Sequence, residues 1–356
     1  MSAVRERAST RRGGPEALPG ALEPARERRG DFTRLVRALP GDAVVFADAR
    51  VLRLHPRVAS ALSRHRVLRV TAGEALKSLS SLERLARQLA GVPRSATFVA
   101  LGGGTVGDAI TVLAHLHKRG VRLLHVPTTM LAAVDSSVGG KGAVNVGDVK
   151  NALGVFHGAA ETWLCPDFFG TLSEAQRREG RLEAWKMAVT LDAEAFRRWS
   201  RRAPADEVLV REARAMKEQV VAADPFETKG VRVVLNFGHT FGHVLESTSA
   251  YRVRHGEAVG LGMLCALDVG VALGVTPPAV ARAVESALPQ GDGARARLAH
   301  LAARRDVATV RRLLAADKKG AGRGLRMVLL RAPGEWTVAE VPESVWAPLW
   351  RGGWPA

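Results

Sequence analysis

The sequence predicts an α/β protein in two parts, a parallel sheet covered by helices followed by an all-α part. Three observations support this. Short apolar strands alternate with amphipathic helices in the first half of the chain, and strand signals almost vanish in the second half. The length of 356 residues also exceeds what one hydrophobic core usually serves. We expect an α/β domain over 31–170 and a helical domain over 171–356.

Residues 1–30 precede these elements, and we expect them to form a disordered extension. They are rich in Arg, Glu, Gly and Pro and hold almost no large apolar side chains. Four glutamates argue against an organellar transit peptide, and the apolar stretch of a signal peptide is missing. These features predict a cytoplasmic protein.

The strands of the first half are short and mostly apolar. The expected strands are 43–46, 67–70, 97–101 and 121–126, with an amphipathic helix over 79–89. Strands that alternate with helices, without hairpin turns between them, indicate a parallel sheet covered on both faces.

The second half shows helical spacing of its apolar residues and no internal repeat. The expected helices are 182–199, 207–222, 242–246, 257–273 and 307–316. They predict the all-α second domain.

Composition narrows the class of protein. Hydrophobic residues make up 47% and charged residues 24%, as in soluble globular proteins, and no apolar run reaches the ~20 residues that span a bilayer. The net charge of +17 is mostly scattered arginine, and aromatics are only 5%, so there is no stacking platform for nucleic acid. We expect neither nucleic acid nor a membrane as partner, but an anion-binding cleft.

Cys165 and Cys265 are the only cysteines. Two cysteines are too few for a disulfide scaffold or a four-cysteine metal site. We expect both to be reduced and buried.

A glycine loop, residues 102–107, follows the strand at 97–101 and opens a helix. It satisfies G-x-G-x-x-G, which lets the backbone approach a pyrophosphate at the helix N-terminus. The alternative is an ordinary tight turn between strand and helix. No acidic residue follows at the usual distance, whereas Glu74 and Lys77 come earlier and can hold ribose hydroxyls. The loop therefore predicts a Rossmann-like domain of variant geometry that binds a dinucleotide.

Three histidines lie close together in the helical half. His239 and His243 are four residues apart and share one helix face, and His255 follows sixteen residues after His239. Zinc accepts neutral imidazole and carboxylate ligands, so the cluster favours a metal site over isolated structural histidines. The spacing alone leaves open which histidines bind and which carboxylate completes the set.

A second polar cluster lies on glycine-rich segments of the first half. It holds Asp135, Lys141, Lys150 and Asn151. Two lysines, an aspartate and an asparagine suit a polyhydroxylated anion, although an ordinary polar loop is the alternative.

Together these residues resemble the 3-dehydroquinate synthase family. The matching blocks are Pro127-Thr128-Thr129 through Lys141, Val144-Asn145, Lys150-Asn151, Asn236 through His243, His255 through Val259, and Asp317-Lys318-Lys319. They stand in the family's order over residues 40–335. The departures include Leu182, Met187 and Gly142, none of which removes a proposed ligand or lysine, and Glu227 lies one residue farther from Arg232 than in the family pattern.

The resemblance implies a role for each matching residue. Glu183, His239 and His255 would bind zinc, with cobalt as an alternative. Lys141, Asn151, Lys186 and His243 would act in catalysis. Arg119, Asp135, Lys150, Lys217, Arg232, Asn236 and Lys318 or Lys319 would bind the substrate. Glu74, Lys77, Gly103, Gly104, Asp108, Thr128, Thr129 and Thr171 would bind NAD.

The same resemblance implies a reaction. The substrate would be a small anionic sugar-acid phosphate, 3-deoxy-arabino-heptulosonate 7-phosphate, and the products 3-dehydroquinate and phosphate, in the shikimate pathway of aromatic amino acid biosynthesis. The steps would be transient NAD-dependent oxidation, phosphate elimination, re-reduction and intramolecular aldol closure, in a homodimeric lyase.

Three other functions remain open. Another sugar phosphate cyclase, such as a 2-epi-5-epi-valiolone or 2-deoxy-scyllo-inosose synthase, would share most of these residues. A metal-dependent alcohol or glycerol dehydrogenase would share the glycine loop but has no anion to match Lys141, Lys150 and Asn151. A non-catalytic paralogue or a nucleic-acid binder would not need intact Glu183 and His239.

Overall fold

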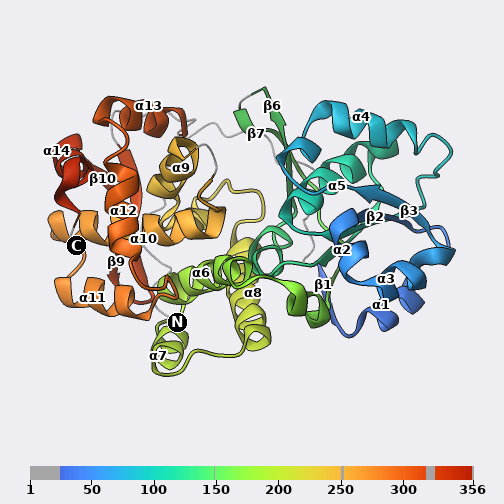
Figure 1. Cartoon of the computed structure of the whole chain (residues 1–356), viewed down its shortest axis with the longest axis horizontal. Helices are drawn as coiled ribbons and strands as arrows, with labels where there is room; N and C mark the ends of the chain where they lie inside the picture. Colours follow the sequence, from blue (N-terminus) through green and yellow to red (C-terminus); the bar gives the residue numbers. More distant parts are fainter. Residues whose placement is uncertain (1–24, 148, 250–251, 318–324, 355–356) are drawn as a thin grey trace.

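The structure, a computed structural model, describes residues 25–147, 149–249, 252–317 and 325–354. An α/β half and a mostly helical half lie side by side along the long axis of the molecule (Figure 1). The fold class predicted from the sequence is confirmed. Residues 1–24 of the expected extension, and the expected substrate residues Lys318 and Lys319, lie outside the described residues.

The α/β half is built on a six-stranded sheet in the order β1-β8-β5-β4-β2-β3, with all neighbours parallel. The strands are β1 (Arg26–Arg29), β2 (Val44–Asp48), β3 (Arg66–Val70), β4 (Thr97–Gly102), β5 (Arg122–Pro127) and β8 (Glu161–Leu164). All four strands expected from the sequence are confirmed, as β2 to β5. Every residue of the central strand β4 is buried, as in a sheet covered on both faces.

Helices cover both faces of this sheet because alternate strand residues point to opposite sides. Phe46 and Phe98 pack with α4 and α5, whereas Val45 and Val99 pack with α1 to α3. The helices are α1 (Phe32–Ala38), α2 (Ala49–Leu54), α3 (Pro56–Ala61), α4 (Leu79–Arg87) and α5 (Gly104–Leu116), with short turns η1 (Leu62–Arg64), η2 (Glu74–Leu76), η3 (His117–Arg119), η4 (Ala132–Ser136) and η5 (Pro166–Thr171).

The prediction that residues 1–30 are all disordered is wrong for the end of that segment. Residues 26–29 form β1, an edge strand parallel to β8. Arg28 pairs with Glu161 of β8, their side-chain N and O atoms 3.6 Å apart. The strand is mostly exposed, and it is held by backbone hydrogen bonds and ion pairs, which a hydropathy pattern does not reveal.

The expectation of no hairpin is also wrong. The strands β6 (Lys141–Val146) and β7 (Val149–Phe156) pair antiparallel in a separate two-stranded sheet. Gly147 has a φ of 55°, which glycine adopts at little cost in a tight turn. The hairpin carries Lys141 at its start and Lys150 and Asn151 near its turn, so it brings together the polar cluster seen in the sequence.

The second half is mostly helical, as expected. Its helices are α6 (Glu174–Leu191), α7 (Ala193–Arg201), α8 (Asp206–Ala223), α9 (His239–Thr248), α10 (His255–Ala272), α11 (Pro278–Ala287), α12 (Ala294–Ala302), α13 (Val307–Asp317) and α14 (Glu343–Pro348), with short turns η6 (Val231–Asn236) and η7 (Leu349–Gly353). The sequence did not predict the hairpin of β9 (Leu325–Ala332) and β10 (Glu335–Val341), which packs on α10.

The helix expected over 182–199 is two helices, because α6 ends and α7 begins at Asp192. The backbone of Asp192 is extended, and its carboxylate accepts hydrogen bonds from the backbone N–H of Glu194 and Ala195 at 3.0 and 2.9 Å. A side chain that caps a new helix in this way ends the preceding one.

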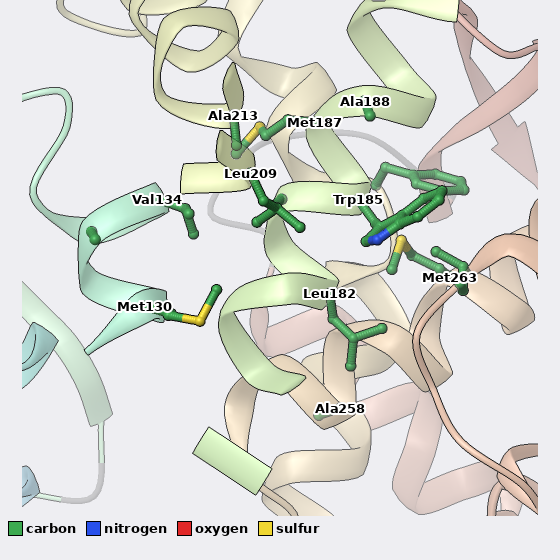
Figure 2. Close-up of a cluster of buried hydrophobic side chains, with 14 of the residues drawn as sticks. Met130, Val134, Leu182, Trp185, Met187, Ala188, Leu209, Ala213, Ala258 and Met263 are labelled. Carbon is green, nitrogen blue, oxygen red and sulfur yellow. The ribbon is translucent and has the colours of Figure 1, made fainter. Parts of the chain in front are cut away.

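Helix α6 lies at the centre of the helical half. Figure 2 shows Leu182, Trp185 and Met187 of α6 packed between α8, α10 and the segment at Met130 and Val134. Because side chains around α6 are buried against different elements, its polar residues Glu183 and Lys186 are buried as well. The apolar packing of α6 therefore fixes a carboxylate inside the protein.

Helix α10 crosses closely over α9 and α6. A Cβ on Gly262 would lie 1.9 Å from the carbonyl oxygen of Gly238, and a Cβ on Gly256 would lie 2.5 Å from Glu179 Cα. Only glycine permits such backbone contact. Of the helices that the structure describes, α10 is long and apolar enough to cross a membrane, but 72% of it is buried, as in the core helix of a folded domain.

Candidate active site

A cavity of about 1950 Å³ opens at the carboxyl ends of β2, β4 and β5 and is lined on its other side by the helical half. The chain runs from β2 outward to β3 and then returns to β4 on the other side of β2. Open α/β sheets bind ligands at such a change of direction. The cavity therefore lies where this fold class places its ligand.

The glycine loop forms one wall of the cavity. Gly103 precedes the first residue of α5, and Gly103 and Gly104 both line the cavity. A Cβ on Gly104 would lie 3.1 Å from Ser136 Oγ, and one on Gly103 would lie 3.3 Å from Thr129 Cγ2. The predicted strand–loop–helix context is confirmed, and the N-terminus of α5 is available to an anion.

Asp48 is a cavity residue that the sequence analysis missed. It ends β2, the strand beside β4, and its carboxylate accepts a hydrogen bond from Arg50 N at 2.9 Å. In Rossmann-like domains an acid at the end of the strand next to the glycine loop binds ribose hydroxyls. That strand precedes the loop in this chain, so only the strand order reveals the acid.

A network of polar side chains joins the glycine-loop helix to the β6–β7 hairpin. Lys77 Nζ donates to Asp108 Oδ2 at 2.6 Å and to Asn151 Oδ1 at 2.5 Å. Glu74 accepts from Asn145 Nδ2 at 2.8 Å and lies 3.4 Å from Lys150 Nζ. Burial raises the pKa of Asp108, an effect that the charge of Lys77 opposes.

Six of the eight expected cofactor residues line the cavity, and two do not. The six are Glu74, Lys77, Gly103, Gly104, Asp108 and Thr129. Thr128 is buried beside the wall, where its N–H donates to Gly102 O at 2.9 Å. Thr171 lies on η5, where its hydroxyl contacts His55 Nε2 at 3.0 Å.

The candidate metal ligands come from three helices. Glu183 of α6, His239 at the start of α9 and His255 at the start of α10 bring one ligand atom each to within 4.8 Å of one another. Each histidine Nε2 faces Glu183 Oε1, at 3.7 Å from His239 and 3.6 Å from His255. The spacing of the histidines left the ligand set open, and the packing of α6, α9 and α10 brings together the three residues that the family resemblance implied.

The carboxylate of Glu183 is suited to a cation. It is fully buried, and neither oxygen has a hydrogen-bond partner, although Lys186 Nζ lies 2.5 Å from Oε2 in an ion pair. A buried carboxylate without hydrogen bonds is costly unless a cation satisfies it. The set of two imidazoles and one carboxylate leaves a coordination position open, as in catalytic zinc sites.

The second nitrogen of each histidine ring has its own partner. His239 Nδ1 lies 3.3 Å from the carbonyl oxygen of Phe237, and His255 Nδ1 lies 3.3 Å from Glu246 Oε2. Such partners fix the ring so that Nε2 faces the metal. Glu246 was not predicted from the sequence, although it lies seven residues after His239 and therefore on the same face of α9.

The charges around the site favour a cation. Burial alone would raise the pKa of Glu183, but Lys186 and the two histidines hold it well below its usual value. Burial and Lys186 keep the pKa of His239 well below its usual value, which leaves the ring neutral. Burial would lower the pKa of His255, but hydrogen bonds to Glu183 and Glu246 raise it to about 10. A bound metal would displace that proton.

The role of Glu246 is testable through metal affinity. We expect Glu246→Gln to weaken zinc binding by roughly 10-fold or more, because partners behind a ligating histidine typically contribute 10–100-fold. Competition with a fluorescent zinc chelator measures this. Glu257→Gln is the matched control, since Glu257 also lies near His255 in sequence but pairs with Arg297. Equal affinities for both variants would contradict the role of Glu246.

Aromatic packing fixes the other side of α9. Phe241 lies between the two histidines of this helix in sequence, and its ring stacks on Trp350 with centroids 5.7 Å apart. Trp346 and Trp354 also contact Phe241. The C-terminal segment thus holds the helix that carries His239 and His243.

The lysines and arginine expected to bind an anion gather on the same cavity. Lys141, Lys150, Lys186, Lys217, Arg232 and Asn236 all line it, together with Asp135, Asn151 and His243. Lys141 Nζ lies 2.6 Å from Glu227 Oε2, and Glu227 is itself a lining residue. Its shifted place in the sequence therefore does not remove Glu227 from the site.

Arg232 has unused hydrogen-bonding capacity. Its side chain is buried, Nη1 donates to Pro225 O at 2.9 Å, and Nε has no partner. The carboxylate of Asp224 orders the preceding loop by accepting from the backbone N–H of Thr228, Lys229 and Val231. A buried guanidinium with a donor to spare suits a carboxylate or phosphate.

Arg119 does not line this cavity. It lies on η3, beyond the end of α5, with a φ of 68°. The substrate contact expected from Arg119 stays a prediction, since this side chain is not among the residues that line the cavity in one copy of the chain.

Comparison with known proteins identifies the family. The model of the 3-dehydroquinate synthase N-terminal region matches residues 67–179, and that of the C-terminal region matches residues 180–320. The 3-dehydroquinate synthase of Endomicrobium trichonymphae is 33% identical over 330 residues, covering 88% of this chain and 90% of the relative.

Two solved structures share the fold. A 2-deoxy-scyllo-inosose synthase complexed with carbaglucose-6-phosphate, NAD⁺ and Co²⁺ has a TM-score of 0.78 and 22% identity, covering 93% of this chain and 99% of its own. ValA, the 2-epi-5-epi-valiolone synthase of Streptomyces hygroscopicus subsp. jinggangensis 5008 with NAD⁺ and Zn²⁺ bound, also has a TM-score of 0.78, with 24% identity and coverage of 92% and 95%. Their fold is that of the sugar phosphate cyclases. The chain belongs to the 3-dehydroquinate synthase family.

Proposed function

We propose that this protein is a 3-dehydroquinate synthase, a lyase that converts 3-deoxy-arabino-heptulosonate 7-phosphate to 3-dehydroquinate and phosphate. One observation carries the proposal: a single cavity joins the glycine loop, the Glu183–His239–His255 set and the lysine and arginine group. The reaction needs all three, because it combines a hydride exchange, a polarised hydroxyl and an anionic leaving group.

The cofactors are NAD and a divalent metal, zinc or cobalt. The wall at Gly103, Gly104 and Asp48 would hold NAD, and Glu183, His239 and His255 would hold the metal. When bound, NAD supplies reversible hydride transfer and the metal supplies Lewis-acid polarisation of a substrate hydroxyl. In this assignment the α/β domain over 31–170 binds the cofactor, and the helical domain over 171–356 binds the metal and the substrate.

The side chains of the chain do the remaining work. Arg232 and Lys141 bind the charged groups of the substrate and stabilise negative charge that develops on oxygen. Lys217 holds Asp135 through hydrogen bonds of 2.6 Å, so that Asp135 keeps one orientation toward the substrate hydroxyls. His243 lines the cavity beside His239, where its ring can exchange a proton with the substrate.

The protein acts in this proposal as a cytoplasmic homodimer in the shikimate pathway. Cys165 and Cys265 are free and buried, which suits a reducing compartment. Val149 and Leu153 of the hairpin are 57% and 49% exposed, and exposed apolar side chains of this kind suit a contact with a second copy.

A test separates this function from a dehydrogenase. We expect one phosphate released per substrate with only a trace of NAD⁺ and no steady rise at the NADH absorbance band, because the hydride returns to the same molecule. The assay uses the heptulosonate phosphate, with sedoheptulose 7-phosphate and glucose 6-phosphate as matched alternatives. Stoichiometric NADH without phosphate would indicate a dehydrogenase. Phosphate from one of the other sugars alone would indicate a different cyclase.

A further inference from the structure

Arg214 is a buried charge for which the reaction described above has no direct use. It lies on α8 and is 1% exposed, and each of its three guanidinium nitrogens has a partner. Nη1 donates to Ala133 O at 2.6 Å and to Ser137 Oγ at 2.8 Å. Nε donates to Glu27 Oε2 and Nη2 to Glu218 Oε1, both at 3.3 Å.

The cost of burying this guanidinium indicates a specific role. Burial lowers the pKa of Arg214, although the carboxylates of Glu218 and Glu27 oppose that effect. Removing a charge from water costs several kcal/mol unless every donor is matched. An aliphatic side chain would fill the same space without that cost. Compared with such a side chain, the arginine contributes the hydrogen bonds to Ala133 and Ser137.

Helix α8 holds the same segment at two further points. Lys217, three residues after Arg214, donates to both the carbonyl and the carboxylate of Asp135. Val221, four residues further, lies 3.2 Å from where a Cβ on Gly139 would stand. Residues spaced by three and four share one helix face. One stripe of α8 therefore contacts residues 133–139 along their whole length.

The segment held in this way connects the parts of the active site. It contains η4, a single π-helical turn, and π turns are intrinsically uncommon and often occur at functional sites. Asp135 lines the cavity, and Ser136 is the residue against which Gly104 of the glycine loop packs. A shift of this turn would move a substrate-facing carboxylate relative to the cofactor loop.

We propose that Arg214 is a positioning residue for the reaction, which ties η4 and Asp135 to α8 and, through Glu27, to the N-terminal strand β1. Its target, the orientation of Asp135 toward the substrate, rests on the proposed function. If Arg214 has this role, strand β1 also contributes to activity. Glu27 of β1 supplies one of the two carboxylates that neutralise Arg214.

The test is a double-mutant cycle that combines Arg214→Met with Asp135→Asn. The measured quantity is kcat/KM for phosphate release. Each value is corrected for the fraction of folded protein, which thermal unfolding measures. We expect Arg214→Met alone to lower kcat/KM by roughly 10- to 100-fold, since misplacing a substrate-positioning group costs that much. In the Asp135→Asn background the further loss should be less than about threefold, because residues that act as a unit are not additive. Ser137→Ala, which removes one acceptor only, should show the same pattern with a smaller loss.

Arg211→Met is the matched control. Arg211 lies one turn earlier on α8 with its side chain 48% exposed, and we expect wild-type kcat/KM. Arg214→Lys should recover part of the loss, because a lysine reaches some of the same acceptors. Losses that multiply fully in the double mutant, or wild-type kcat/KM for Arg214→Met, would overturn the positioning role.

Hydrogen exchange tests the role without substrate. The N–H of Ser137 donates to Ala132 O and that of Val138 to Asp135 O, both at 3.0 Å within the turn. We expect Arg214→Met to speed exchange at these two amides by more than about 10-fold while amides of α5 stay unchanged. An inactive wild type would contradict only the proposed function. Unchanged exchange at both amides would contradict the positioning role whatever the activity.

Discussion

Replacing His255 by alanine is expected to abolish stable metal binding and most of the activity. His255 is the ligand of choice for this test because its side chain is 32% exposed, whereas Glu183 is fully buried against Lys186. Removing Glu183 would leave a buried lysine unpaired and perturb the fold. His255→Ala therefore separates loss of metal from loss of structure.

We expect about one zinc per wild-type chain and well below that for His255→Ala after dialysis against a weak chelator. Loss of one of three ligands should weaken binding by more than about 100-fold, since even the groups that hydrogen-bond to a ligating histidine typically contribute 10–100-fold. Loss of Lewis-acid stabilisation worth about 4 kcal/mol should lower kcat/KM by roughly 1,000-fold. Elemental analysis and the phosphate-release assay measure both.

His243→Ala is the control for this experiment. Its ring centroid lies 5.4 Å from that of His239, so the substitution is equally close to the site, yet His243 is outside the candidate ligand set. We expect normal zinc content with reduced turnover. Undiminished zinc in His255→Ala, or lost zinc in His243→Ala, would show that the ligand assignment is wrong.

Arg232→Ala should produce the next largest effect. The arginine is buried at the cavity wall with an unpartnered Nε, and a charged hydrogen bond to substrate is worth about 1.5–3 kcal/mol. The expected loss in kcat/KM is roughly 10- to 150-fold, with zinc content unchanged. Steady-state phosphate release over a range of substrate concentrations measures it.

Arg198→Ala is the matched control, because Arg198 forms an ion pair with Glu212 on the surface and is 54% exposed. Solvated surface pairs contribute little, so kcat/KM should stay at the wild-type value. If the two arginine variants were equally active, the anion site proposed at Arg232 would be incorrect.

The local pattern of the sequence predicted most of the regular elements. The buried strand β4 and the glycine loop that follows it were predicted because a continuous apolar run and a G-x-G-x-x-G spacing are local signals. The strand β1 was not predicted, because Glu27 and its neighbours are polar and the strand depends on the edge of β8. The break at Asp192 was missed because α6 and α7 share helical spacing across it.

Part of the candidate site was also predicted from local sequence patterns. His239 and His243 share a helix face by spacing alone, whereas the link to Glu183, more than fifty residues earlier, came from the family resemblance. The partners that orient the site were not predictable locally. Glu246 is opposite His255 because α10 approaches α9 at Gly262, and Arg214 meets Ser137 across 77 positions of sequence.

The sequence by itself determined the classes of element, the glycine loop and the set of chemical groups, because these depend on residues near one another in the chain. Tertiary structure alone decided the strand order that makes Asp48 a neighbour of the glycine loop and the position of Arg119 away from the cavity wall. It also decided that α6, α9 and α10 meet, which brings Glu183, His239 and His255 together. Those outcomes depend on which elements pack together, and packing is a property of the whole buried core rather than of any segment.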